Sequence, residues 1–306
     1  MASISRRRFI AISAAAAGLG AGRAAWAAEP PVEWRGIALG APARLVLHHP
    51  DRPAALRLLE QMRGEIERLE RIFSLYRPDS ALVMLNGAGR LDSPPADLVV
   101  CLNQALSMAA LSGGAFDPTV QPLWELHARH FRQPHPDPAG PAQADIEAAR
   151  ALVDWRRVRL SSDVIELAPG MAVTLNGIAQ GYATDRVADL LRAQGLATVL
   201  VHLGETRITG RPEPRGAWRI ALPDGRIIAL TGDAALATSS PDGTRFSPCC
   251  HHLFDPTTGR SARDAAPITL RAPTAALADA LSTAAAIAPQ RAAEMISAVP
   301  GAYMLV

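Results

Sequence analysis

The sequence predicts an α+β fold in which mixed sheets pack against helices. Two observations lead to this class. Amphipathic stretches with a helical period are interspersed with short apolar stretches typical of strands, and no regular strand–helix–strand rhythm or internal repeat connects them. The chain has 306 residues, of which 49% are hydrophobic and 20% charged, which is enough for one large domain or two intimately joined lobes.

The N-terminal 27 residues have the order of an export signal. A basic stretch with Arg6 and Arg7 precedes an alanine-rich apolar stretch and an "AWA" cleavage pattern at Ala25–Ala27. The arginine pair resembles the twin-arginine pattern. A membrane anchor is the alternative, but the apolar stretch is too short and too rich in glycine for a stable span. We therefore expect a signal over residues 1–27, a mature domain over 28–306, and a periplasmic protein that is peripheral to the membrane at most.

Charge and cysteine content argue against two further classes. The net charge of +2 gives no electrostatic reason to expect nucleic acid as a partner. The three cysteines are Cys101, Cys249 and Cys250. They lack the spacing of metal ligands, and their odd number argues against a disulfide framework.

The first part of the mature chain is expected to form a strand and two helices. Ala43–His48 alternates like a strand, and Asp51 and Pro53 then open a helix. Its apolar stripe consists of Leu58, Leu59, Met62, Ile66, Leu69 and Phe73. Leu75–Asn86 is interpreted as rich in turns, and Leu98–Leu111 as an amphipathic helix that ends at Gly113–Gly114.

The second part is expected to contain mostly short strands. The proline-rich stretch Arg132–Gln143 before it is interpreted as a surface loop without chemistry. The expected strands are Val158–Leu160, Val164–Leu167, Thr198–His202, Trp218–Leu222, Ile227–Leu230 and Tyr303–Val306. A last helix is expected at Ala275–Ala288, before the final strand.

The stretch "VTLNGIAQGYATDRVADLL" begins as a strand that ends near Leu175 and continues, after a turn with Gly177 and Gly181, as a helix. The buried face of that helix is expected to carry Ala183, Val187, Leu190 and Leu191. A helix N-terminus offers unpaired N–H groups to a phosphate. The alternative is that the glycines only allow a tight turn and a close packing contact.

The late helix carries a second polar feature. Asp279 and Thr283 project from one face, with Ser282 between them, and their neighbours are alanine and leucine. A buried carboxylate needs a partner. A hard cation such as Mg²⁺ is one partner, and a hydrogen-bonding loop is the other.

Two further stretches carry weaker signals. In "HHLFDPTTGRSA", His252 is expected to begin a strand that Asp255 and Pro256 terminate. This histidine suits either a general acid or base or an ordinary surface residue. The stretch "SGGAFDPTVQPLWEL" joins a Gly-Gly turn to Asp117, with exposed amides that would suit a planar or nucleotide ligand.

Five stretches, taken in order, resemble the ApbE family, the FAD:protein FMN transferases. They are "DSALVMLN", "GGAFDPTVQPL", "LNGIAQGYATDRVADLLRAQG", "HHLFDPTTGR" and "ALADALSTAAAI". The resemblance spans nearly all of the mature chain. It implies the ApbE-like (T-fold-like) fold and an enzyme that binds FAD and Mg²⁺, cleaves the pyrophosphate, transfers FMN to a Thr or Ser of a target protein and releases AMP.

The resemblance also implies roles for particular residues. The metal site would comprise the Gly177 backbone oxygen, Asp279 and Thr283, with Ser282 nearby, and His252 would be catalytic together with Asp279. The expected FAD-binding residues are Leu39, Tyr76, Ala115, Phe116, Asp117, Thr174, Gln180 and Phe254. In this scheme Tyr76 lies against the ring system, and Thr174 and Gln180 lie beside the pyrophosphate.

Three positions depart from the family pattern. Thr174 replaces a usual Asp, Gln180 replaces a Lys or Glu, and "HLGET" (His202–Thr206) puts Glu205 into a usual glycine pair. Thr174 and Glu205 leave open a non-catalytic FAD-binding protein. The resemblance also leaves open a hydrolase that converts FAD to FMN and AMP, which would need the same metal site with water in place of the protein hydroxyl. The chain also resembles the NosX-type branch, which implies an acceptor of the NosR, RnfG or NqrC kind and a role in the maturation of nitrous oxide reductase.

Overall fold

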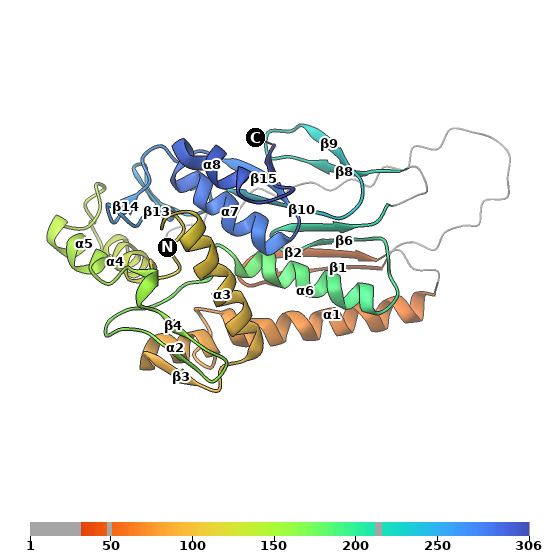
Figure 1. The fold of residues 1–306 in the computed structure, drawn as a ribbon, viewed down its shortest axis with the longest axis horizontal. Helices are drawn as coiled ribbons and strands as arrows, with labels where there is room; N and C mark the ends of the chain where they lie inside the picture. The colour runs from red at the N-terminus through yellow and green to blue at the C-terminus, as the bar shows by residue number, and fades with distance from the viewer. Residues whose placement is uncertain (1–31, 48–50, 212–215, 306) are drawn as a thin grey trace.

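The computed structural model describes residues 32–47, 51–211 and 216–305 (Figure 1). The export signal expected over residues 1–27 lies outside the described residues and stays a prediction, as does the boundary at residue 28. Within the described part of the chain, no helix combines the length and the apolar character needed to cross a membrane.

The centre of the fold is a seven-stranded sheet in which all neighbouring strands are antiparallel. Its order is β1 (Val32–Ala38), β2 (Ala41–Leu47), β6 (Val199–His202), β7 (Thr206–Thr209), β10 (Ala234–Ser239), β15 (Ile268–Ala272) and β16 (Tyr303–Met304). Strands from both ends of the chain therefore meet in one sheet, which is the arrangement of an α+β fold. The predicted fold class is confirmed.

Three helices pack on this sheet (Figure 1). Helix α1 (Arg52–Phe73) contacts β1 and β2, α6 (Ala179–Ala193) contacts β6 and β7, and α7 (Ala275–Ile287) contacts β10 and β15. Successive residues of a strand face opposite sides of a sheet. In β10 the residues that face α7 are Ala235 and Ala237, whereas Ala234 and Leu236 face the hairpin of β8 (Trp218–Ala221) and β9 (Ile227–Leu230).

Helix α1 begins and packs as the sequence predicts. The Asp51 side chain accepts a hydrogen bond from Ala54 N at 3.0 Å, and Pro53 occupies the first turn, where its missing N–H costs nothing. The predicted apolar stripe is buried along its whole length, from Leu58 to Phe73. The helix ends at Phe73, and Ser74 follows as its C-cap.

The largest core lies between the sheet helices and a group of smaller elements. These are α2 (Ala81–Ala88), β3 (Arg90–Asp92), α3 (Ala96–Leu111), β4 (Arg159–Leu160), β5 (Val164–Glu166) and α8 (Ala292–Ser297). Strands β3, β5 and β4 form a separate sheet. Helix α3 ends where the sequence predicts, at Leu111. Ser112 is its C-cap, and Gly113 and Gly114 follow with positive φ.

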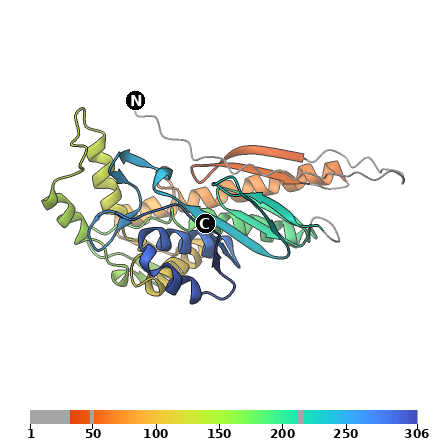
Figure 2. The ribbon, with the colours of Figure 1, turned by 90° about the horizontal axis from the view of Figure 1, so that it is seen from above.

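A further group of elements gathers at one end of the molecule (Figures 1 and 2). It comprises α4 (Gln121–Phe131), α5 (Gln143–Arg150), β11 (Arg245–Ser247), β12 (Cys250–His251), β13 (Phe254–Asp255) and β14 (Arg260–Ser261). Its centre is aromatic, with the rings of His127 and Phe254 4.6 Å apart and Phe246 beside both. Leu253, which lies between β12 and β13, connects this group to the largest core.

Several predicted elements were wrong. Leu75–Asn86 is rich in turns only over residues 75–80, because Ser80 accepts a hydrogen bond from Val83 N and so caps α2, which contains residues 81–86. His252 does not begin a strand: it lies between β12, which ends at His251, and β13. Leu190 is only partly buried. The expected strand before Leu175 is absent, as described below.

Acid should destabilise the fold through His202, at the end of β6. Burial, together with the nearby Arg44 guanidinium, lowers the pKa of His202 to about 4. The ordinary value near 6.5 holds in the unfolded chain, which therefore binds more protons between pH 4 and 6.5. The contribution of His202 to the free energy of unfolding is fully present above about pH 6.5. It falls as the pH drops, by about 2 kcal/mol between pH 7.5 and pH 5.

Urea unfolding of wild type and His202→Asn at pH 7.5 and pH 5 measures this contribution. The variant should lose about 2 kcal/mol less than wild type over this interval. Burial also lowers the pKa of His127 and His251, so the variant should keep part of the pH dependence. Equal losses in the two proteins would contradict the assignment to His202.

Candidate active site

The turn after Leu175 and the late helix, far apart in the sequence, are in direct contact. Gly181 N in the first turn of α6 donates a hydrogen bond to Asp279 Oδ2 at 3.1 Å. Asp279 is only 5% exposed. A Cβ at position 181 would lie 2.2 Å from the Ala275 carbonyl oxygen, so only glycine permits this approach. Gly181 therefore allows the close packing contact that was one of the two alternatives for these glycines. The contact is with α7, which carries Asp279, the predicted metal ligand.

Further oxygen atoms gather along the same face of α7. Ser239 Oγ, at the end of β10, lies 2.8 Å from Ser282 Oγ and 3.0 Å from Thr283 Oγ1. A Cβ at position 177 would lie 3.2 Å from Thr283 Oγ1. The structure thus brings together Gly177, Asp279, Ser282 and Thr283, and adds Ser239, which the sequence reasoning missed. A serine at the end of a buried, alanine-rich strand was the available signal.

The chemistry of this group fits one type of cation. Its donors are one carboxylate, three hydroxyl groups and a nearby backbone turn, and all are oxygen. Across the described residues, no group of three or more His, Cys, Asp or Glu side chains is placed to hold a metal. A single protein carboxylate suits Mg²⁺, which keeps water and phosphate oxygens as its other ligands.

The Gly-Gly loop lies beside the same turn. A Cβ on Gly177 would lie 3.1 Å from the Phe116 ring, and Thr174 N donates to Pro118 O at 2.7 Å. The Asp117 carboxylate accepts hydrogen bonds from Thr119 N at 2.8 Å and Thr119 Oγ1 at 2.6 Å, and burial raises its pKa. Asp117 therefore shapes the loop around the turn.

Residues 171–175 form no strand. Instead, the Asn86 side chain occupies both backbone groups of Val173: it donates to Val173 O and accepts from Val173 N, each at 2.8 Å. Next to Val173, Thr174 Oγ1 accepts a hydrogen bond from Asn176 N at 3.3 Å. The Asn86 side chain and the loop at Pro118 thus supply the hydrogen bonds that a neighbouring strand would make. Sequence reasoning missed the role of Asn86, although it is the last residue of the quoted stretch "DSALVMLN".

Two of the three positions that the sequence analysis set apart, Gln180 and the turn at Gly204–Glu205, meet in space. A Cβ on Gly204 would lie 2.9 Å from Gln180 Oε1, so the Gln180 side chain covers this turn. The buried Glu205 follows, and its Oε2 accepts from Thr238 N at 3.3 Å. Thr238 directly precedes Ser239. Glu205 is therefore bonded to the backbone of β10 one residue before Ser239.

The hairpin of β11 and β12 positions His252. Its backbone N donates to Thr244 O at 3.1 Å, and its ring Nδ1 lies 3.2 Å from Thr244 N and 3.1 Å from Thr244 O. These contacts fix the ring. Phe254, also expected at the FAD, is 2% exposed and belongs to the aromatic cluster with His127.

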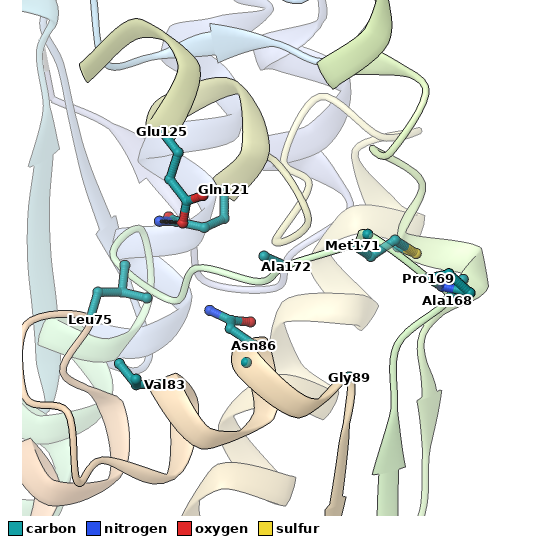
Figure 3. A pocket seen from close by; sticks show the side chains of 12 residues that line it. Leu75, Val83, Asn86, Gly89, Gln121, Glu125, Ala168, Pro169, Met171 and Ala172 are labelled. Atoms are coloured by element: carbon teal, nitrogen blue, oxygen red, sulfur yellow. Dashed lines mark hydrogen bonds between the residues drawn. The ribbon is translucent and has the colours of Figure 1, made fainter. Parts of the chain in front are cut away.

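The residues expected near the flavin ring lie at the C-terminal end of α1. Leu39 adopts a left-handed backbone conformation with φ 49°, and its N donates to Glu70 Oε1 at 3.0 Å. Tyr76 is 72% exposed, just beyond the helix. Adjacent Leu75 lines a pocket of about 530 Å³, together with Asn86, Gln121 and Glu125 (Figure 3). Within this lining, Gln121 Nε2 donates a hydrogen bond to Glu125 Oε1 at 2.9 Å.

Comparison with known proteins identifies the family. The model of the ApbE family matches residues 39–305. Curated proteins called FAD:protein FMN transferase match over most of the chain. The Treponema pallidum protein is 29% identical over 263 residues, 74% of this chain and 70% of its own length. The Vibrio cholerae protein is 31% identical over 224 residues, 67% of this chain and 63% of its own length.

Solved structures give the same result. The ApbE protein from Thermotoga maritima superposes with a TM-score of 0.79 at 27% identity, covering 90% of this chain and 93% of the other. The apo form of the Pseudomonas stutzeri flavinyl transferase ApbE gives a TM-score of 0.76 at 27% identity, with 90% and 91% covered. From the family match over residues 39–305 and these likenesses, we conclude that the chain belongs to the ApbE family.

Proposed function

We propose that this chain is an exported, Mg²⁺-dependent FAD:protein FMN transferase that attaches FMN through a phosphoester to a Thr or Ser of an acceptor flavoprotein. The enzyme class, flavin transferase, rests on the family match and on its curated relatives. The metal, the location and the acceptor are inferred from the residues.

One observation carries the proposal. The bond between Gly181 N and Asp279, and the contacts of Ser239 with Ser282 and Thr283, assemble a small polar site of oxygen donors at the N-terminus of α6. An anion at a helix N-terminus is stabilised by unpaired N–H groups and by the helix dipole. A pyrophosphate at this turn would have a metal site on one side and helix amides on the other.

Asp279 and Thr283, with the Gly177 backbone oxygen, would hold the cation, and Ser282 and Ser239 would support Thr283 through their hydroxyl groups. When bound, Mg²⁺ would neutralise negative charge on the phosphoryl oxygens. The Asp279 carboxylate has a second task in this arrangement, because its bond to Gly181 N keeps the first turn of α6 in place.

Group transfer requires one bond to form and one to break. The acceptor hydroxyl oxygen forms a bond to the phosphorus of the FMN half, the bond from that phosphorus to the bridging oxygen breaks, and AMP leaves. The hydroxyl proton goes to His252 Nε2. This step needs the tautomer in which Nδ1–H donates to Thr244 O, because the lone pair is then on Nε2.

The test uses the mature protein with FAD, Mg²⁺ and a purified NosR-type flavoprotein domain, followed by mass spectrometry of the intact acceptor. We expect the mass of the acceptor to increase by one FMN, and AMP to appear in equal amount. Free FMN and AMP without an adduct would show hydrolysis instead. FAD that stays bound and intact would show a non-catalytic accessory protein.

Export has its own test. Arg6 and Arg7 belong to a pattern that resembles the twin-arginine signal, which directs folded proteins. Replacing both with lysine keeps the charge, and we expect the precursor to stay in the cytoplasm of the producing cell. Cell fractionation and immunoblotting measure this. Undiminished export of the lysine variant would exclude the twin-arginine route, whether or not the enzyme is active.

A further inference from the structure

Helices α6 and α7 share a second contact, centred on Asp185. Ala275 N donates to Asp185 Oδ1 and Ala276 N donates to Asp185 Oδ2, each at 2.9 Å. These are the first two residues of α7, and their N–H groups have no acceptor within the helix. Thr274 is the N-cap residue, and its Oγ1 accepts a hydrogen bond from Leu277 N at 3.2 Å. The start of α7 is therefore capped largely by a carboxylate from another helix.

This contact and the Gly181–Asp279 bond are one helical turn apart on both helices. Asp185 follows Gly181 by one turn on α6, and Asp279 follows Ala275 by one turn on α7, so the helices are antiparallel and facing. Helix α7 is held by its packing on β10 and β15. Two hydrogen bonds to α6 at different heights further restrain its rotation and its sliding along the axis.

Charge supports the same role. Arg207 Nε on β7 lies 3.7 Å from Asp185 Oδ1, and both side chains are mostly buried. Burial raises the pKa of Asp185 to about 6, although the two backbone N–H groups and Arg207 act in the opposite direction. The group is therefore ionised at neutral pH, and an anion at a helix N-terminus is favourable.

We propose that Asp185 is a positioning residue of the transferase site: it holds the start of α7 so that Asp279 and Thr283 face the turn at Gly177. Its consequence for catalysis rests on the proposed function. The positioning itself can be measured without turnover.

The test is Asp185→Asn. The asparagine oxygen can accept only one of the two N–H groups, and its own amide would face the other donor. By hydrogen-exchange mass spectrometry, we expect at least tenfold faster exchange in residues 275–283 and 177–182, with β1 and β2 unchanged. With an active acceptor pair, kcat should fall at least tenfold while KM for FAD changes less than threefold.

Asp189→Asn is the matched control, because Asp189 lies on the same helix one turn later and is exposed. It should behave as wild type. If Asp185→Asn does not fold, Asp185→Glu should show the same local increase in exchange, with a smaller effect. Unchanged exchange in both segments, or an equal increase in β1 and β2, would overturn the proposal. Absence of transfer by wild type would refute the proposed function and leave the exchange result to decide this one.

Discussion

Replacing Asp279 with asparagine should lower the rate of FMN transfer at least hundredfold and raise the Mg²⁺ concentration for half-maximal activity at least tenfold. The substitution keeps the shape of the side chain, and the remaining oxygen can still accept from Gly181 N. It removes the one carboxylate of the oxygen cluster, and a hard cation loses most of its attraction to the site without that charge. Steady-state transfer over a Mg²⁺ titration, followed by mass spectrometry, measures both quantities.

The matched control is Glu294→Gln on α8, which removes an exposed carboxylate that is paired with Arg291 on the protein surface. It should leave the rate and the Mg²⁺ dependence within twofold of wild type. Binding of Mn²⁺, followed by its paramagnetic resonance, separates a loss of metal from a loss of chemistry. A folded Asp279→Asn variant with wild-type metal binding and rate would assign the carboxylate to helix packing alone.

Where local signals are strong, the sequence predicted the structure well. Helix α1 has an N-cap, a proline in the first turn and an apolar stripe, and all three describe the same helix. Strand β9 has the predicted bounds, and α7 ends one residue earlier than predicted. In each case, short-range hydrogen bonds and one buried face determine the element, so a window of the sequence contains the information.

Elements whose partners are distant could not be predicted. The segment at Val173 has the sequence pattern of a strand, but the Asn86 side chain takes the place of a strand partner. Helix α4 was not expected, because it lacks a capping side chain. Distance in the sequence also concealed Ser239 and Asp185, since their roles exist only where β10 and α6 meet α7.

The departures from the family pattern have different physical meanings in the fold. Gln180 and the Gly204–Glu205 turn are neighbours, so these changes can compensate each other. Thr174 is separate: its backbone N is bonded to Pro118 and its hydroxyl to Asn176 N, so it stabilises the turn without adding charge. Within the oxygen cluster on α7, the negative charge therefore comes from the carboxylate of Asp279.

Removing the imidazole in His252→Ala should reduce kcat for FMN transfer at least hundredfold, while the dissociation constant for FAD changes less than threefold. Proton transfer by a positioned side chain contributes about 10²- to 10⁴-fold to a rate. The ring is held at Nδ1 by the Thr244 backbone. Single-turnover transfer and fluorescence titration of FAD measure the two quantities independently.

His252→Asn decides between proton transfer and positioning. An asparagine can still bond to the Thr244 backbone, so it preserves the hairpin geometry, but it cannot accept a proton at neutral pH. If His252 accepts the hydroxyl proton, the asparagine variant should be as slow as the alanine variant. If asparagine restores the rate, or if FAD binding weakens as much as the rate falls, His252 only orients the ligand. The proton of the acceptor hydroxyl would then have to go to another group, and the first one to examine is the Asp279 carboxylate of the oxygen cluster.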